Sequence, residues 1–205
     1  MCFDTKSSLL SWIISITIAI YLYKRNRKFD RWNFYFIITF SSIQLLEAAI
    51  HAGFDKDRIV SLILVMLLLQ PLVQNLGCYS YLKSENDTSS SIIKPFLYLY
   101  VVLLAYIYIF SLRNKFTSYK GENGHLVWEV VSSNNENKNL MSTPIQYLYL
   151  FGLFFPLLFM GQTGYILITV GVLTALYSYL TSSGKEFSSM WCFTSVIYSI
   201  VCIFL

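Results

Sequence analysis

The long apolar stretches of this chain hold a single acidic residue, Glu47, with a histidine, His51, four positions after it. The other acidic residues lie in the segments between these stretches. An ionisable side chain at membrane depth is costly, so it usually faces a protein-lined or water-filled interior and marks a functional site. Residues four apart are neighbours on a helix surface, so Glu47 and His51 can share a proton or a ligand.

Further polar side chains are spaced to accompany Glu47 inside the membrane. Gln44 precedes it by three residues, and Gln70 and Gln74 repeat at four residues in the next apolar stretch, with Asn75 beside them. Polar seams of this kind hydrogen-bond between membrane helices. A buried carboxyl group can also load and release a proton or bind a cation. The polar site of a small transporter or channel-like protein would then comprise Gln44, Glu47, His51, Gln70, Gln74 and Asn75.

A second grouping follows from the side of the membrane on which residues lie. Cys2 precedes the first apolar stretch, His51 ends the second, and His125 follows the fourth. An even number of crossings separates these positions, so all three face one side. Cys, His and carboxylate are the usual zinc ligands, and such a site binds or activates water. The alternative function is a membrane-embedded zinc-dependent hydrolase with Cys2, Glu47, His51 and His125 as ligands.

Each of these residues also has a simpler interpretation. Glu47 can be protonated, or can hydrogen-bond to Gln70 or a tyrosine, and so stabilise helix packing alone. His51 can cap the negative end of its helix dipole. His125 can be a solvated loop residue. Under these interpretations the chain is a structural protein of a virion or cellular membrane, with no cofactor.

Composition predicts the elements that position these residues. The chain is 56% apolar and 13% charged, against about 25% charged in soluble domains. A hydrocarbon core about 30 Å thick needs about 20 helical residues, and only helices or closed barrels satisfy the backbone there. We predict an all-α, seven-helix integral membrane bundle forming a single domain over residues 1–205. The helices are expected at about 8–23, 32–51, 59–82, 92–112, 145–160, 165–180 and 190–205.

The fifth and sixth predicted helices are close to the short limit for a span. Only residues 161–164 separate them, and Pro156 is expected to kink the fifth. A re-entrant pair is the alternative to two crossings.

In the loop between the fourth and fifth helices, we predict a short β-hairpin over residues 116–131, because Asn123-Gly124 is a turn pair flanked by β-branched and aromatic residues.

The distribution of basic residues predicts orientation and one partner, the lipid bilayer. Five basic residues follow the first apolar stretch: Lys24, Arg25, Arg27, Lys28 and Arg31. Such a cluster marks a cytoplasmic loop that faces anionic lipid. The N-terminus is then extracytoplasmic, and seven crossings place the C-terminus in the cytoplasm. The cluster is short and adjoins the membrane, so nucleic acid is not an expected partner.

Two activities are excluded by residue type. A retinal-binding protein needs a lysine in its last helix for the Schiff base, and residues 190–205 contain none. A voltage sensor needs spaced arginines within a span, and no stretch has them. The sequence also lacks HExxH, paired CxxC and GxSxG motifs. A small-molecule or ion ligand stays compatible with the sequence.

The opening Met1-Cys2-Phe3-Asp4, together with Gln44-Leu-Leu-Glu47, resembles a group of uncharacterised multi-pass membrane proteins of bacteria and large DNA viruses. Those proteins begin Met-Cys-Phe-Ser and carry a similar Gln-x-x-Glu in their second helix. The likeness covers the first quarter of the chain, and Asp4 stands where Ser is usual. It implies a seven-helix membrane protein of viral or bacterial type and brings no activity.

Overall fold

The computed structural model describes residues 4–131, 138–139, 143–182, 186–194 and 196–205, and they are mostly helical. Six helical segments are long and apolar enough to cross a membrane: α1, α2, α3, α4, α6 and the α7–α8 segment. The elements are α1 (Thr5–Arg25), α2 (Asp30–His51), α3 (Lys56–Ser84), α4 (Ser90–Arg113), α5 (Thr143–Phe154), α6 (Gln162–Thr181), α7 (Phe187–Thr194), α8 (Val196–Phe204), the 3-10 helix η1 (Phe155–Met160), and strands β1 (Lys115–Lys120), β2 (Leu126–Val131) and β3 (Lys138–Asn139).

The helices α1 and α3 extend beyond the predicted apolar stretches, and polar side chains cap their N-terminal ends. Asp4 accepts a hydrogen bond from the backbone N–H of Ser7 at 2.8 Å, so α1 begins before the apolar run. Asn26 ends α1 in the left-handed conformation, with φ of 54°. The Asp55 carboxylate accepts from the first backbone N–H groups of α3. Capping thus adds a turn at helix ends that hydropathy alone does not detect.

The fifth predicted helix, residues 145–160, differs from expectation. It consists of α5 followed by the 3-10 helix η1, with Pro156 at the start of η1. Proline lacks a backbone N–H and clashes with the preceding turn, so the α-helix ends there. The apolar portion, Tyr147–Met160, is shorter than the six candidate spans. Gly161, with φ of 62°, then reverses the chain into α6.

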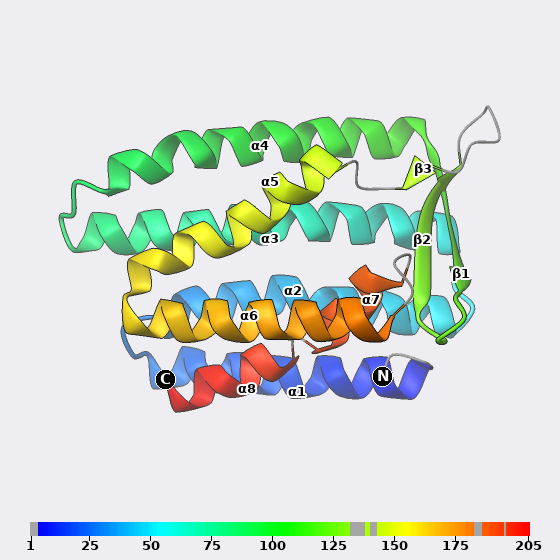
Figure 1. The fold of residues 1–205 in the computed structure, drawn as a ribbon, viewed down its shortest axis with the longest axis horizontal. Coiled ribbons are helices and arrows are strands. Elements are labelled where there is room, and N and C mark those ends of the chain that lie inside the picture. Colours follow the sequence, from blue (N-terminus) through cyan, green and yellow to red (C-terminus); the bar gives the residue numbers. More distant parts are fainter. Residues whose placement is uncertain (1–3, 132–137, 140–142, 183–185, 195) are drawn as a thin grey trace.

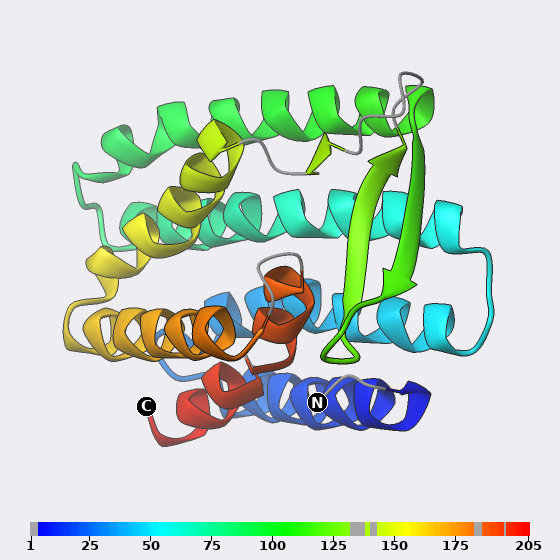
Figure 2. The ribbon, with the colours of Figure 1, turned by 45° about the vertical axis from the view of Figure 1, so that its right-hand side comes forward.

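The helices lie side by side, and the β-hairpin stands across one end of the bundle (Figures 1 and 2). β1 and β2 are antiparallel, with Phe116 opposite Val130 and Lys120 opposite Leu126. The short β3 pairs with β2. The predicted hairpin is therefore confirmed, as a part of a small three-stranded sheet. The N-terminal end of α1 lies at the hairpin end of the bundle, and the C-terminal end lies at the other.

The outer helices present large apolar side chains to the surroundings. Val102 of α4 is 65% exposed and Leu173 of α6 is 58% exposed. The core is built chiefly from α1, α2 and α3, where Leu22, Ile37 and Ile63 are fully buried. In a soluble protein an apolar surface of this extent would aggregate or bind a partner. Together with the six long apolar helices, it suggests a membrane protein.

Candidate functional site

Glu47 is fully buried one turn before α2 ends. The Ser189 hydroxyl of α7 donates a hydrogen bond to its Oε1 at 2.6 Å. This bond joins residues 142 positions apart. The sequence suggested Gln70 or a tyrosine as the partner that would make Glu47 a packing residue. Gln70 instead accepts from the Tyr149 hydroxyl at 2.5 Å, so Glu47 belongs to a separate polar cluster.

That cluster includes both histidines of the chain. His51 is half-buried at the end of α2, and His125, immediately before β2, is only 2% exposed. The solvated-loop interpretation of His125 is therefore wrong. His51 lies near enough to both His125 and Asp4 to shift their pKa values. The structure thus brings the two imidazoles toward one another at the end of the bundle covered by the hairpin.

Glu186, immediately before α7, joins the same cluster. It is fully buried, and the backbone N–H of Asn123 donates to its Oε1 at 3.0 Å. The hairpin tip approaches so closely that a Cβ on Gly121 would lie 1.8 Å from the same oxygen. Gly121 in turn donates its N–H to the His125 carbonyl at 2.8 Å, which closes the turn. Glu186 therefore fixes the hairpin over the site.

The surroundings of His125 favour its neutral form. Burial lowers its pKa, because desolvation disfavours the imidazolium, and His51 acts in the same direction. The negative charge of Glu186 opposes these effects and raises the pKa in part. The net direction is downward from the ordinary value. The neutral imidazole of His125 is therefore favoured over the imidazolium.

This direction predicts that the hairpin is held less firmly in acid. The folded-state pKa of His125 lies below its unfolded value of about 6.5, so the folded state binds fewer protons and its stability falls as pH drops below that value. Hydrogen exchange of the β1–β2 amides, corrected for intrinsic rates, should show reduced protection at pH 5 relative to pH 7.5. His125→Gln should abolish the change, and His51→Gln should keep it. Equal loss in the His125→Gln protein would assign the effect to another group.

The glutamines and the asparagine of α3 form a second polar layer, near the middle of the bundle. Gln74 accepts from the Trp32 indole N–H at 2.6 Å. Asn75 donates to the carbonyls of Pro71 at 2.7 Å and Gly152 at 3.2 Å. These bonds, with Tyr149 to Gln70, connect α3 to α2 and to α5. The predicted set is therefore divided: Gln44, Glu47 and His51 on α2 are one group, and Gln70, Gln74 and Asn75 are another.

A small cavity adjoins this middle layer. Its volume is about 40 Å³, and its lining includes Gln70, Gln74, Tyr149 and Tyr198 among apolar side chains. A water needs about 10–15 Å³ of such space, so the cavity has room for two or three. The Tyr198 hydroxyl donates to Asn33 Oδ1 at 3.0 Å. Asn33 also lines a cavity of about 190 Å³ at the opposite end of the bundle from the hairpin.

The predicted zinc ligands do not assemble among the described residues. No three His, Cys, Asp or Glu side chains in the described part of the chain gather as a metal ion requires. Cys2 lies outside the described residues, so zinc coordination that includes it stays a prediction. The described residues do not form a metal centre by themselves.

Sequence reasoning missed Glu186 and Ser189. Ser189 precedes Cys192 by three residues, the helical spacing that indicates a shared face, and this signal could have identified it. Glu186 follows a lysine in a short polar segment between apolar stretches, where acids are usually solvated. Its burial depends on contact with the tip of the hairpin, which no local pattern encodes.

The chain matches no protein-family model, no curated protein and no solved structure. The site is accordingly interpreted from its own geometry.

Proposed function

We propose that the chain is an integral membrane protein that crosses the bilayer seven times and conducts or transports protons or a small cation, with Glu47 as the ion-binding group. Six long apolar helices support the membrane assignment. The α5–η1 segment supplies the seventh crossing. At the usual rises of α- and 3-10 helices its apolar portion, Tyr147–Met160, extends about 24 Å, a short span that a locally thinned bilayer accommodates. Its irregular geometry is buried against α3 and α6, where membrane proteins tolerate it.

The observation that carries the transport proposal is a succession of polar groups along the bundle axis. It begins at the cavity beside Asn33, continues through Tyr198 to the cavity at Gln70, and resumes at Gln44 and Glu47 near the hairpin end. Phe40 lines the middle cavity on the side of Glu47. From Phe40 to Glu47 is about 10 Å along α2. Movement of the side chains that lie between Phe40 and Glu47 would join the middle cavity to the polar groups at Glu47.

The chemistry of the hairpin end suits proton exchange. A carboxyl group accepts and releases a proton as its surroundings change. Ser189 donates to that carboxyl group at 2.6 Å, and His51, one turn after Glu47 on α2, lies close enough to His125 under the hairpin to influence it. The basic cluster at the opposite end supports a cytoplasmic assignment for that end. The hairpin and Glu47 then face the extracytoplasmic side, and the hairpin covers the entrance.

The other two hypotheses stay predictions. A zinc hydrolase needs at least three ligands at one point, and the described residues do not supply them. In a purely structural role in a virion or cellular membrane, the task of Glu47 would be the hydrogen bond that joins α2 to Ser189 of α7, which an uncharged side chain could also provide. Burying an ionisable group is costly in lipid, so the transport proposal accounts for more of what is observed.

Reconstitution in liposomes tests the proposal. We expect purified protein to dissipate an imposed pH gradient or Na⁺ gradient faster than empty liposomes, as followed with a pH- or Na⁺-sensitive dye. Tyr198→Phe removes the hydroxyl that joins the two cavities and should lower the flux about tenfold, the loss of one hydrogen bond of about 1.4 kcal/mol. Tyr179→Phe is the control, because Tyr179 of α6 is 67% exposed and lines neither cavity. Absence of both fluxes in correctly folded protein would refute the proposal.

A further inference from the structure

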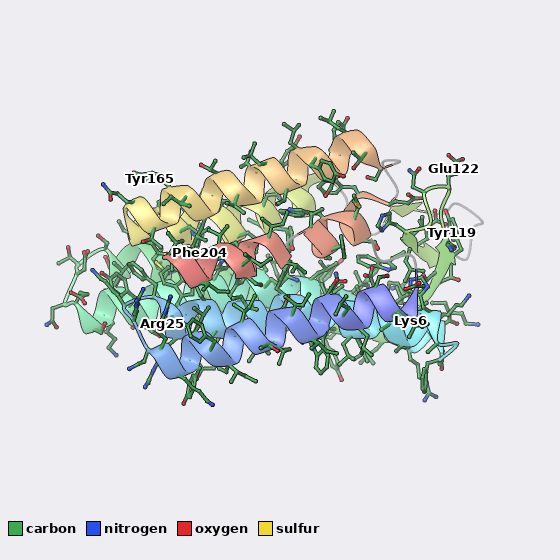
Figure 3. All side chains as sticks on the ribbon, turned by 90° about the horizontal axis from the view of Figure 1, so that it is seen from below. Lys6, Arg25, Tyr119, Glu122, Tyr165 and Phe204 are labelled. Carbon is green, nitrogen blue, oxygen red and sulfur yellow. The ribbon has the colours of Figure 1, made fainter. Side chains whose placement is uncertain are left out.

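The end of the bundle opposite the hairpin contains a cavity of about 190 Å³ with a basic lining. Arg25, Arg27 and Lys28 contribute to it from the α1–α2 connection, and Asp30 is the single acid. Thr163 contributes from the start of α6. Figure 3 shows Arg25 at the same end of the bundle as Tyr165 of α6 and Phe204 of α8. The volume is roughly ten times that needed for one water, so the cavity can accept a larger polar group.

The charges of this cavity leave a net positive site. Asp30 is already neutralised: its Oδ1 accepts from Arg25 at 2.7 Å, and its Oδ2 accepts from Arg25 at 2.9 Å and from the backbone N–H of Arg27 at 2.7 Å. The Arg25 guanidinium also binds the Cys202 and Ile203 carbonyls. Arg27 and Lys28 are exposed, and no described residue forms an ion pair with either side chain. The lining is therefore net positive, although the Lys28 ammonium group also lies over the Phe29 and Tyr81 rings and is close enough to Glu85 for that acid to help raise its pKa.

The start of α6 adds hydrogen-bond donors to the same cavity. Gly161 caps this helix, and no side chain accepts from its first backbone N–H groups. The positive end of the helix dipole favours an anion, and Thr163 of the first turn lines the cavity. The start of α6 and the basic side chains thus border one space, and a phosphate group is an anion that both favour.

An apolar groove lies further along the same helices. Its volume is about 310 Å³, and it is lined by α6 and the last two helices through Val170, Leu173, Thr174, Tyr177, Thr194 and Ile197. Val170 lies two turns beyond Thr163, hence on the same face of α6. Along the axis the groove spans about 10 to 20 Å from Thr163. One leaflet of the hydrocarbon core is about 15 Å deep, so the groove lies at the depth of an acyl chain.

We propose that the α6–α8 side of the bundle binds one anionic phospholipid, with its phosphate headgroup in the cavity at Arg27 and Lys28 and an acyl chain in the groove at Val170 and Ile197. Charge selects the headgroup, and the apolar groove selects a lipid over free phosphate. Basic cavities between membrane helices on the cytoplasmic side commonly hold anionic headgroups. This assignment does not depend on Glu47 or on ion transport.

Native mass spectrometry of delipidated protein tests the headgroup. Titration with phosphatidylglycerol and with phosphatidylcholine of the same acyl chains should show one lipid retained, with at least tenfold preference for the anionic one. The double variant Arg27→Gln, Lys28→Gln should lose that preference. The control Lys83→Gln, Lys94→Gln removes the same charge at the same end but outside the cavity, and should bind as the wild type does. Equal retention of both lipids, or equal loss in both double variants, overturns the proposal.

A second arm tests the acyl chain. Ile197→Trp fills the groove at a position already 48% exposed, so the fold should tolerate it, and lipid retention should fall several-fold. Leu180→Trp, at a position 72% exposed on α6 and outside the groove lining, is the control. Glycerol phosphate, which has the headgroup chemistry without chains, should not displace the lipid at equal concentration. Displacement by glycerol phosphate, or unchanged retention in Ile197→Trp, would show that the site takes a free phosphate compound instead.

Discussion

Glu47→Gln is expected to lower ion flux through the reconstituted protein about a hundredfold, the order contributed by a positioned proton-transfer group, while the fold is kept. The glutamine amide has nearly the shape of the carboxyl group but cannot take up or release a proton. Its carbonyl oxygen can still accept the hydrogen bond that Ser189 now donates at 2.6 Å. Flux with a pH- or Na⁺-sensitive dye and thermal unfolding, measured on one preparation, separate function from stability.

Two companion variants make the interpretation of Glu47→Gln decisive. Ser189→Ala leaves the carboxyl group in place but removes its hydrogen bond, so it should cost about 1–3 kcal/mol of stability and keep flux within a few-fold. Glu122→Gln changes an exposed acid in the hairpin turn and should change neither. If folded Glu47→Gln protein conducts as the wild type does, Glu47 is a packing residue, and the ion-binding role is lost.

Gly77→Ala is expected to destabilise the bundle by about 2–4 kcal/mol, which combines overpacking with a lost buried hydrogen bond. A Cβ at Gly77 would lie 2.3, 2.6 and 2.7 Å from three atoms of the Trp32 indole. Trp32 is 5% exposed, and its N–H bonds to Gln74 at 2.6 Å. Because the ring is buried and its N–H is hydrogen-bonded, relief of the clash requires loss of this bond or separation of α2 from α3. Denaturation of the protein in mild detergent, monitored by helical circular dichroism, measures the loss.

A second substitution tests whether the indole is the cause. Trp32→Leu in the Gly77→Ala background removes the clash, so the two changes together should cost clearly less than the sum of the single changes. Leu76→Ala, at a 51% exposed neighbouring position of α3, should have a small effect. Wild-type stability of Gly77→Ala would mean that α2 and α3 are packed less closely than the contact at Trp32 indicates.

Several features of the site follow from local chemistry and were predictable. The apolar runs identify the helices because each must satisfy its own backbone in lipid. The Asn123-Gly124 pair locates the hairpin, which is present with Gly124 at a φ of 84°. Counting the membrane crossings places His51 and His125 on the same side of the membrane. The effect of His51 on the pKa of His125 agrees with this placement. Pro156 indicated irregularity in the fifth helix, and η1 begins beside it.

Other features depend on contacts between distant segments. Periodicity places Glu47 on a polar stripe but does not identify which helix faces that stripe, so Ser189 was not anticipated. His125 next to a turn has the local signature of a solvated residue, yet the hairpin folds over the bundle and buries it. No local sequence pattern indicates that Glu186 is buried, because its carboxylate is enclosed only when the hairpin tip contacts it through the Asn123 N–H.

What this sequence determines by itself is therefore a set of apolar helices, their order, a hairpin and one acid among them, since each depends on the energetics of a short segment in lipid or water. Only the tertiary structure decides that the acid bonds to α7, that the hairpin covers both histidines, and that basic residues and an apolar groove share the α6–α8 side. Those arrangements result from the packing of helices against one another, where many partners satisfy the same local pattern and shape complementarity selects one.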